Sequence, residues 1–188
     1  MRFKTIIACK IFADELKAVL SSDDMEAKIF WIDAALHTDP PSLEKALRKS
    51  LSRLGKTAGR PVVLLGGGCL PEIDALLKQF EAVRLPSGNC IEAFTGLKKQ
   101  ELDNDRTMIM TPGWIRAWPE IMKALGWDEV DVRINLGRYE RILLLEPGIR
   151  PLTDEEILSF FDLAQVPVDV ESLDLDPFRA LLHTLLEQ

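Results

Sequence analysis

Four side chains of kinds that bind metals are spread over the first half of the chain. They are the three cysteines, Cys9, Cys69 and Cys90, and one of the two histidines, His37. Thiolate sulfur and imidazole nitrogen are the usual ligands of zinc, and three cysteines with one histidine form a known tetrahedral set. Three thiolates can instead hold an iron–sulfur cluster with one open iron position. The chain has no CxxC pair, so the spacing itself does not predict a zinc ribbon or finger.

Two further features lie next to the cysteines. Glu92 follows Cys90 by two residues and could act as a general base or a metal ligand, or simply complement the first turn of a helix. A turn of three glycines directly before Cys69 could cradle an anion or a cofactor phosphate on its backbone amides. The run matches neither the P-loop nor the dinucleotide-binding fingerprint, so a plain tight turn is the alternative. These glycines are Gly66, Gly67 and Gly68.

The segments that must position these residues alternate between strands and helices. Apolar runs predict strands at 3–9, 27–36, 61–66, 82–86, 107–112, 141–147 and 166–172. Helical spacing predicts helices at 11–22, 42–54, 70–80, 88–102, 113–125, 128–136, 153–165 and 176–188. Ser42 is the expected cap of the second helix, and Thr153 with Glu156 forms a capping signature. This alternation predicts a three-layer α/β fold over a single domain, 1–188, with a mostly parallel sheet and helices on both faces, Rossmann-like or flavodoxin-like.

Such a fold would gather the four side chains at one place. Cys9 ends the first predicted strand, and His37, Cys69 and Cys90 follow the second, third and fourth. In a parallel sheet these connections open on one edge, where ligands bind outside the carboxyl ends of the strands. The topology therefore predicts a shared metal site. Separately buried thiols and a surface histidine are the alternative.

The charge balance limits the classes of partner. The net charge is −7 over 188 residues, which argues against nucleic acid because its phosphates require a basic face. No apolar run reaches the ~18 to 20 residues of a membrane-spanning helix, and charged residues interrupt the apolar N-terminal stretch. We therefore expect a cytoplasmic protein with neither a membrane partner nor a signal peptide, whose cysteines form no structural disulfide.

Four stretches of the chain resemble a domain-of-unknown-function family from methanogenic archaea and anaerobic bacteria. The stretches are IIACK, ALHTDP, LGGGCLPEID and SGNCIEAFTG, and they cover roughly the first 100 residues. The residues that fall on the family's pattern are Cys9, His37, Cys69, Cys90, Glu92, Phe94 and Gly96. The neighbouring residues that depart from the pattern are Lys10, Gly68, Leu70, Asn89 and Ile91.

Members of that family often look linked by gene neighbourhood to corrinoid-dependent methyltransferases. The resemblance therefore implies a metal-centred protein of one-carbon metabolism, with a corrinoid protein or a methyltransferase as partner and a corrinoid as a further cofactor. In such a protein the three cysteines would bind zinc or an iron–sulfur cluster. His37 would be a fourth ligand or a neighbour of the metal, and Glu92 an acid–base or supporting group.

Two other functions remain open from the residues alone. One is a non-catalytic binding module, in which a crevice holds a corrinoid, a nucleotide or a partner protein and the cysteines only pack. The other is a thiol redox protein, because glycine-rich turns and helix N-termini can lower the pKa of a cysteine. The chain lacks the DxHxxG signature of the usual cobalamin domains, so we do not expect a cobalamin bound through His37.

Overall fold

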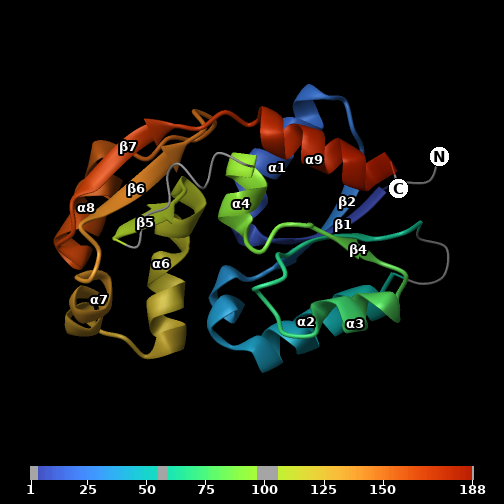
Figure 1. Cartoon of the computed structure of the whole chain (residues 1–188), viewed down its shortest axis with the longest axis horizontal. Coiled ribbons are helices and arrows are strands. Elements are labelled where there is room, and N and C mark those ends of the chain that lie inside the picture. Colours follow the sequence, from blue (N-terminus) through green and yellow to red (C-terminus); the bar gives the residue numbers. More distant parts are fainter. Residues whose placement is uncertain (1–3, 55–58, 97–105, 188) are drawn as a thin grey trace.

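The computed structural model describes residues 4–54, 59–96 and 106–187. These residues form two separate sheets, and every strand pair in them is parallel (Figure 1). The first sheet has the order β2-β1-β3-β4, with β1 (Lys4–Cys9), β2 (Ala27–Ile32), β3 (Val62–Leu64) and β4 (Val83–Arg84). The second has the order β5-β6-β7, with β5 (Thr107–Met110), β6 (Arg141–Glu146) and β7 (Val168–Ser172).

Helices connect the strands throughout the described ranges. The α-helices are α1 (Ala13–Ser22), α2 (Pro40–Ser52), α3 (Ile73–Lys78), α4 (Cys90–Thr95), α6 (Pro112–Leu125), α7 (Glu129–Leu136), α8 (Asp154–Ala164) and α9 (Asp176–Glu187). Two short 3₁₀ helices follow the first two strands directly, η1 (Lys10–Phe12) and η2 (Ala34–Thr38). No helix within these ranges combines the length and apolarity needed to cross a membrane.

The first sheet is covered on both faces, which gives it three layers. Because side chains alternate between the faces of a strand, Ile6 and Val62 join one apolar cluster while Ile7 and Val63 join another. Helices α1, α4 and α9 complete the first cluster, and α2 and α3 complete the second. The predicted α/β class, with parallel strands and helices on both faces, is confirmed.

The second sheet has its own apolar cluster. Met110, Ile142 and Leu144 are fully buried there among side chains of α6, α7 and α8. The alternation in the sequence predicts one sheet, whereas the pairing breaks between β4, which pairs with β3, and β5, which pairs with β6. An apolar run indicates that a segment is extended but not which strand it pairs with, so this break has no signal in the strand pattern.

The last helix returns from the second sheet to the first (Figure 1). Phe178 of α9 stacks on Phe12 with ring centroids 5.5 Å apart and meets Phe94 at 5.0 Å. Asp23, directly after α1, accepts a hydrogen bond from Arg179 and lies 2.7 Å from Nε2 of His183. The core of the first sheet therefore needs residues from both ends of the described chain.

Two helix starts test the expected caps. Asp39, not Ser42, caps α2, and its carboxylate accepts a hydrogen bond from the Ser42 backbone N–H at 3.3 Å. The helix begins earlier than expected because the proline after Asp39 has a backbone angle suited to a first turn. Thr153 and Glu156 form the expected capping box of α8. Of the helix expected at 88–102, α4 is described, and residues 97–102 lie outside the described ranges.

Candidate functional site

The four connections that carry the predicted ligands share one edge of the first sheet. Cys9 is the last residue of β1, and His37 lies in η2 after β2. Cys69 follows β3, and Cys90 is the first residue of α4 after β4. Since β1 to β4 are all parallel, their carboxyl ends lie at the same edge. The expectation that these connections lie side by side is confirmed.

The three cysteines are free and half-buried. Burial raises the pKa of the Cys90 thiol to about 12, and negative charge on Cys9 and Cys69 adds to the rise. Burial likewise raises the pKa of Cys9 to about 11, with a further contribution from Cys69. The sulfurs are therefore close enough for the charge of one to affect the others, and they are protonated near neutral pH.

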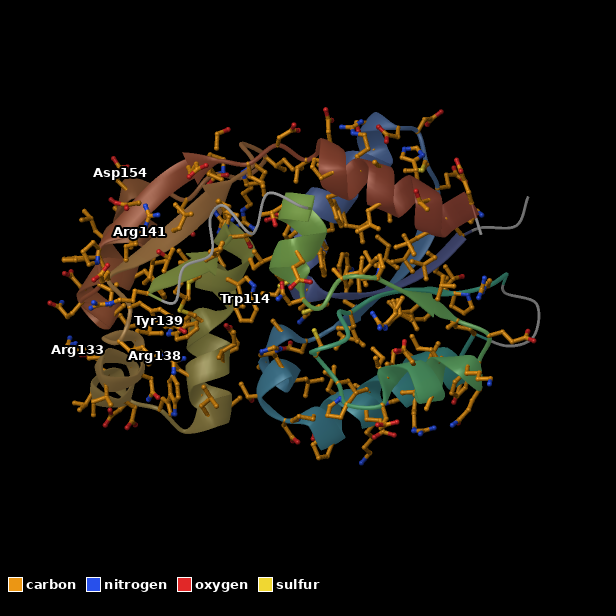
Figure 2. The ribbon with its side chains drawn as sticks, viewed as in Figure 1. Trp114, Arg133, Arg138, Tyr139, Arg141 and Asp154 are labelled. Atoms are coloured by element: carbon orange, nitrogen blue, oxygen red, sulfur yellow. The ribbon has the colours of Figure 1, made fainter. Side chains whose placement is uncertain are left out.

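Trp114, in the first turn of α6, reaches this edge from the second sheet. Its indole Nε1 donates a hydrogen bond to the Cys90 sulfur at 3.2 Å. Its ring meets that of His37 edge-on, with centroids 5.5 Å apart and planes at 88°. Figure 2 shows Trp114 between α6 and α4, at the boundary of the two sheets. The sequence contained the tryptophan but no signal that it would contact a cysteine.

His37, in η2, is exposed. Desolvation by the atoms packed against it lowers the pKa of its imidazole. A lowered pKa keeps the ring neutral at neutral pH, which is the form that binds metals.

The three glycines join two of the connections. The Gly67 amide donates to the Ser87 carbonyl at 3.1 Å, and the Gly68 amide donates to the Gly88 carbonyl at 2.7 Å. The turn before Cys69 is thereby tied to the turn before Cys90. Since these two amides already have acceptors, the hydrogen bonds give no support to the predicted anion cradle.

Glu92 takes part in the start of α4. Its carboxylate accepts hydrogen bonds from the Gly88 backbone N–H at 2.5 Å and the Asn89 side-chain amide at 3.1 Å. Asn89 in turn accepts from the Glu92 backbone N–H at 2.9 Å. This reciprocal capping fixes the turn that presents Cys90. The acid–base or ligand role of Glu92 stays a prediction.

The start of α6 packs directly against the connection that follows Cys9. A Cβ atom on Gly113 would lie 2.6 Å from the carbonyl oxygen of Ile11. Only a residue without a side chain allows this approach. The carboxyl end of β5, which leads into α6, therefore faces the carboxyl edge of the first sheet.

Beside this contact, charged residues of the first and second halves of the chain also lie close together. Arg116 of α6 lies 3.7 Å from the Asp14 carboxylate of α1. Burial raises the pKa of the neighbouring Glu15 to about 7, and the charges of Asp14 and Glu146 add to the rise. Glu146 ends β6, so the carboxyl ends of both sheets contribute to this boundary.

The side chains at this edge are of the types that bind metals, but they are not arranged around a common point. Thiols and a neutral imidazole are the ligands expected for zinc, and thiols alone for an iron–sulfur cluster. In the part of the chain that the structure describes, however, no three side chains of His, Cys, Asp or Glu are arranged to hold a metal ion. Metal binding would require these side chains to turn toward a common point.

Parallel strands, covering helices and thiols gathered at one carboxyl edge define an α/β protein with a thiol-lined site. The chain belongs to the family described as "Protein of unknown function (DUF1638)", whose model matches residues 31–182. The match includes His37, Cys69 and Cys90, and it confirms the resemblance to a domain-of-unknown-function family. No curated protein matches the chain.

Proposed function

We propose that the protein binds a thiophilic metal, as zinc or an iron–sulfur cluster, through Cys9, Cys69 and Cys90. His37 is a fourth ligand or a neighbour of the metal. The observation that supports this proposal is the convergence of three free thiols, from three different connections, within electrostatic reach of one another. Three such thiols supply the soft ligands that these metals prefer.

The raised pKa values of the thiols make proton release a measurable sign of metal binding. Near neutral pH the buried sulfurs carry protons, whereas a metal-bound thiol is deprotonated. Metal binding should therefore release protons, and a fluorescent or absorbing pH indicator in weak buffer would detect them.

The proposed setting is corrinoid-linked one-carbon and methyl-transfer metabolism in the cytoplasm, with a corrinoid protein or a methyltransferase as partner. The family resemblance supports this setting. Bound zinc would supply activation of a substrate thiol, and a cluster would supply electron transfer.

The test is anaerobic reconstitution of the wild type, Cys69→Ser and His37→Ala with zinc or with iron and sulfide. Elemental analysis gives the metal content, and visible absorption distinguishes a cluster from colourless zinc. We expect Cys69→Ser to lose metal while its metal-free melting temperature stays close to that of the wild type. A hydroxyl is a poor replacement for a soft thiolate, whereas the swap on a half-buried turn leaves little cavity.

A matched histidine variant controls for unspecific effects. His183→Ala removes the other histidine, which lies on α9 and pairs with Asp23, and it should leave the metal content unchanged. Absence of metal from the wild type, together with a lower melting temperature of metal-free Cys69→Ser, would contradict the proposal.

One observation favours the alternative of a binding module without chemistry. Cys90 packs against one apolar cluster of the first sheet, Cys69 packs against the other, and Cys9 packs against both. In that function the edge would hold a corrinoid, a nucleotide or a partner protein. Titration of the metal-free protein with a corrinoid and with a nucleotide would show binding that Cys69→Ser does not weaken.

A further inference from the structure

We propose that Trp114 is a positioning residue that holds the Cys90 sulfur from the second sheet, so that the thiol site is complete only when the two sheets are packed together. The inference rests on the proposed function where it concerns metal affinity. Its geometric part, the contact between an indole and a thiol, can be tested without any metal.

The Cys90 sulfur differs from the other two in the donor that it meets. The sulfurs of Cys9 and Cys69 interact with backbone groups of Ile11 and Gly66, both from the first half of the chain. Cys90 receives the indole N–H of Trp114 at 3.2 Å. A single side chain from the second half therefore reaches into the set of thiols.

The helix that carries Trp114 is held by packing on two sides. Ile115 and Ile121 of α6 are buried in the core of the second sheet. Gly113 rests against the Ile11 carbonyl, with no room for a Cβ atom. The helix is thus fixed on one side by the second sheet and on the other by the connection after Cys9, and the indole is aimed at Cys90 as a result.

The same ring also contacts the candidate fourth ligand. The rings of Trp114 and His37 are 5.5 Å apart between centroids and nearly perpendicular. Cys90 and His37 come from different connections, and Trp114 touches both. A metal at this edge would therefore have the orientation of two of its ligands set by one aromatic side chain.

A hydrogen bond to sulfur is stronger when the sulfur carries charge. The indole N–H should therefore favour the Cys90 thiolate over the thiol, and so favour alkylation and metal binding. Phenylalanine at this position would keep an aromatic ring and lose the donor.

The experiment compares Trp114→Phe with Trp118→Phe in the metal-free protein. Alkylation of each cysteine is followed by mass spectrometry at one fixed pH. We expect Trp114→Phe to slow the alkylation of Cys90 by about fivefold, the factor that corresponds to a typical hydrogen bond, and to leave Cys69 unchanged. Trp118→Phe is the same substitution four residues along α6, in the core, where the Trp118 Nε1 has no hydrogen-bond partner among the described residues. Trp118→Phe should change neither rate.

Two results would overturn the geometric part of the inference. One is an unchanged rate at Cys90 in Trp114→Phe. The other is faster alkylation of Cys69 and Cys90 together, which would mean that the indole only covers the site or stabilises the fold.

A second measurement tests the connection to metal. Trp114→Phe should weaken zinc binding by about fivefold in the wild-type background and should have no effect in a Cys90→Ser background. An equal loss in both backgrounds would contradict a role through Cys90. If the wild type binds neither zinc nor a cluster, the proposed function fails, while the alkylation result still decides whether Trp114 acts on the Cys90 sulfur.

Discussion

Gly66 and Gly88 approach each other so closely that a Cβ atom on Gly66 would lie 2.3 Å from the Gly88 carbonyl oxygen and 2.6 Å from the Asn89 Cα. The two glycines belong to the turns after β3 and β4, which carry Cys69 and Cys90. The glycine run therefore serves to bring two backbones together, and its thiol neighbour is placed next to another thiol as a consequence.

Gly66→Ala should push these turns apart. The added carbon would meet backbone atoms that cannot rotate away, so we expect a loss of roughly 1–3 kcal/mol in the free energy of unfolding. Urea unfolding followed by circular dichroism measures it. Gly59→Ala is the control, because a Cβ atom there has no atom of the described residues within 4 Å. Equal unfolding midpoints for the two variants would contradict the close approach.

Glu15→Gln should stabilise the protein at alkaline pH. The pKa of the buried Glu15 is raised to about 7 from an ordinary value of 4.5, so ionisation costs the folded state more than the unfolded state. The stability of the wild type should fall as the pH rises between these values and then level off. We expect the variant to be more stable by on the order of 2–4 kcal/mol at about pH 8.5.

The same pair of proteins at lower pH provides the control. At about pH 5 the folded wild type keeps the proton on Glu15, so the difference in unfolding free energy should be small. A difference of the same size at both pH values would show that the substitution acts through packing and not through charge.

Asp23→Asn should have the opposite dependence on pH. Hydrogen bonding from His183, and then from Ser22, lowers the pKa of Asp23 below its ordinary value of 3.8. The carboxylate therefore contributes stability above that value and loses it as the pH falls through the lowered pKa. We expect Asp23→Asn to be less stable than the wild type near neutral pH, with a difference that shrinks in acid.

Urea unfolding near neutral pH and in acid would measure that change. Asp24→Asn is the control, since Asp24 is exposed and has the left-handed backbone that asparagine also tolerates. If Asp23→Asn and Asp24→Asn were equally stable near neutral pH, the pairing of Asp23 with α9 would contribute nothing.

Arg116→Lys should weaken the packing of α6 against α8 and the segment before it. The Arg116 guanidinium donates to Glu156 at 3.0 Å and to the carbonyls of Arg150 and Pro151 at 3.1 and 3.0 Å. A lysine ammonium cannot reproduce this planar fork, so we expect a loss of about 1–2 kcal/mol. Thermal unfolding at constant pH would detect it.

Arg150→Lys is the matched control for that variant. The Arg150 side chain is 65% exposed and its charge meets Asp14 only at 3.7 Å. Exposed pairs of this kind contribute little, and the backbone carbonyl that Arg116 uses is unchanged. A loss in Arg150→Lys as large as that in Arg116→Lys would show that the planar fork of Arg116 is not what stabilises this contact.

Periodicity predicted the elements and their parallel class, because each element buries a face with its own repeat. It did not predict that β5 begins a second sheet, nor that Asp39 replaces Ser42 as a cap. The pairing of β5 with β6 depends on contacts between distant segments, which no local pattern records. Two polar residues three positions apart, Asp39 and Ser42, could each have capped this helix, and the local pattern did not distinguish them.

The candidate site, too, was predicted from the sequence only in part. The shared edge of Cys9, His37, Cys69 and Cys90 followed from strand order in the sequence and from parallel pairing. The contact of Trp114 with Cys90 did not, because it arises from packing between two sheets. Trp118, four residues away on the same helix, has its ring buried in the core. Helical spacing alone could not separate these two tryptophans.

The return of α9 to the first sheet also sets an order of events during synthesis. The strands and helices around Phe12 and Phe94 leave the ribosome first, but Phe178 and Leu182, which are fully buried in the same core, are made much later. At ~5 to 20 residues per second, on the order of ten seconds separate Phe94 from Phe178. During that interval the nascent chain exposes an apolar face of its first sheet, which is the kind of surface that chaperones bind.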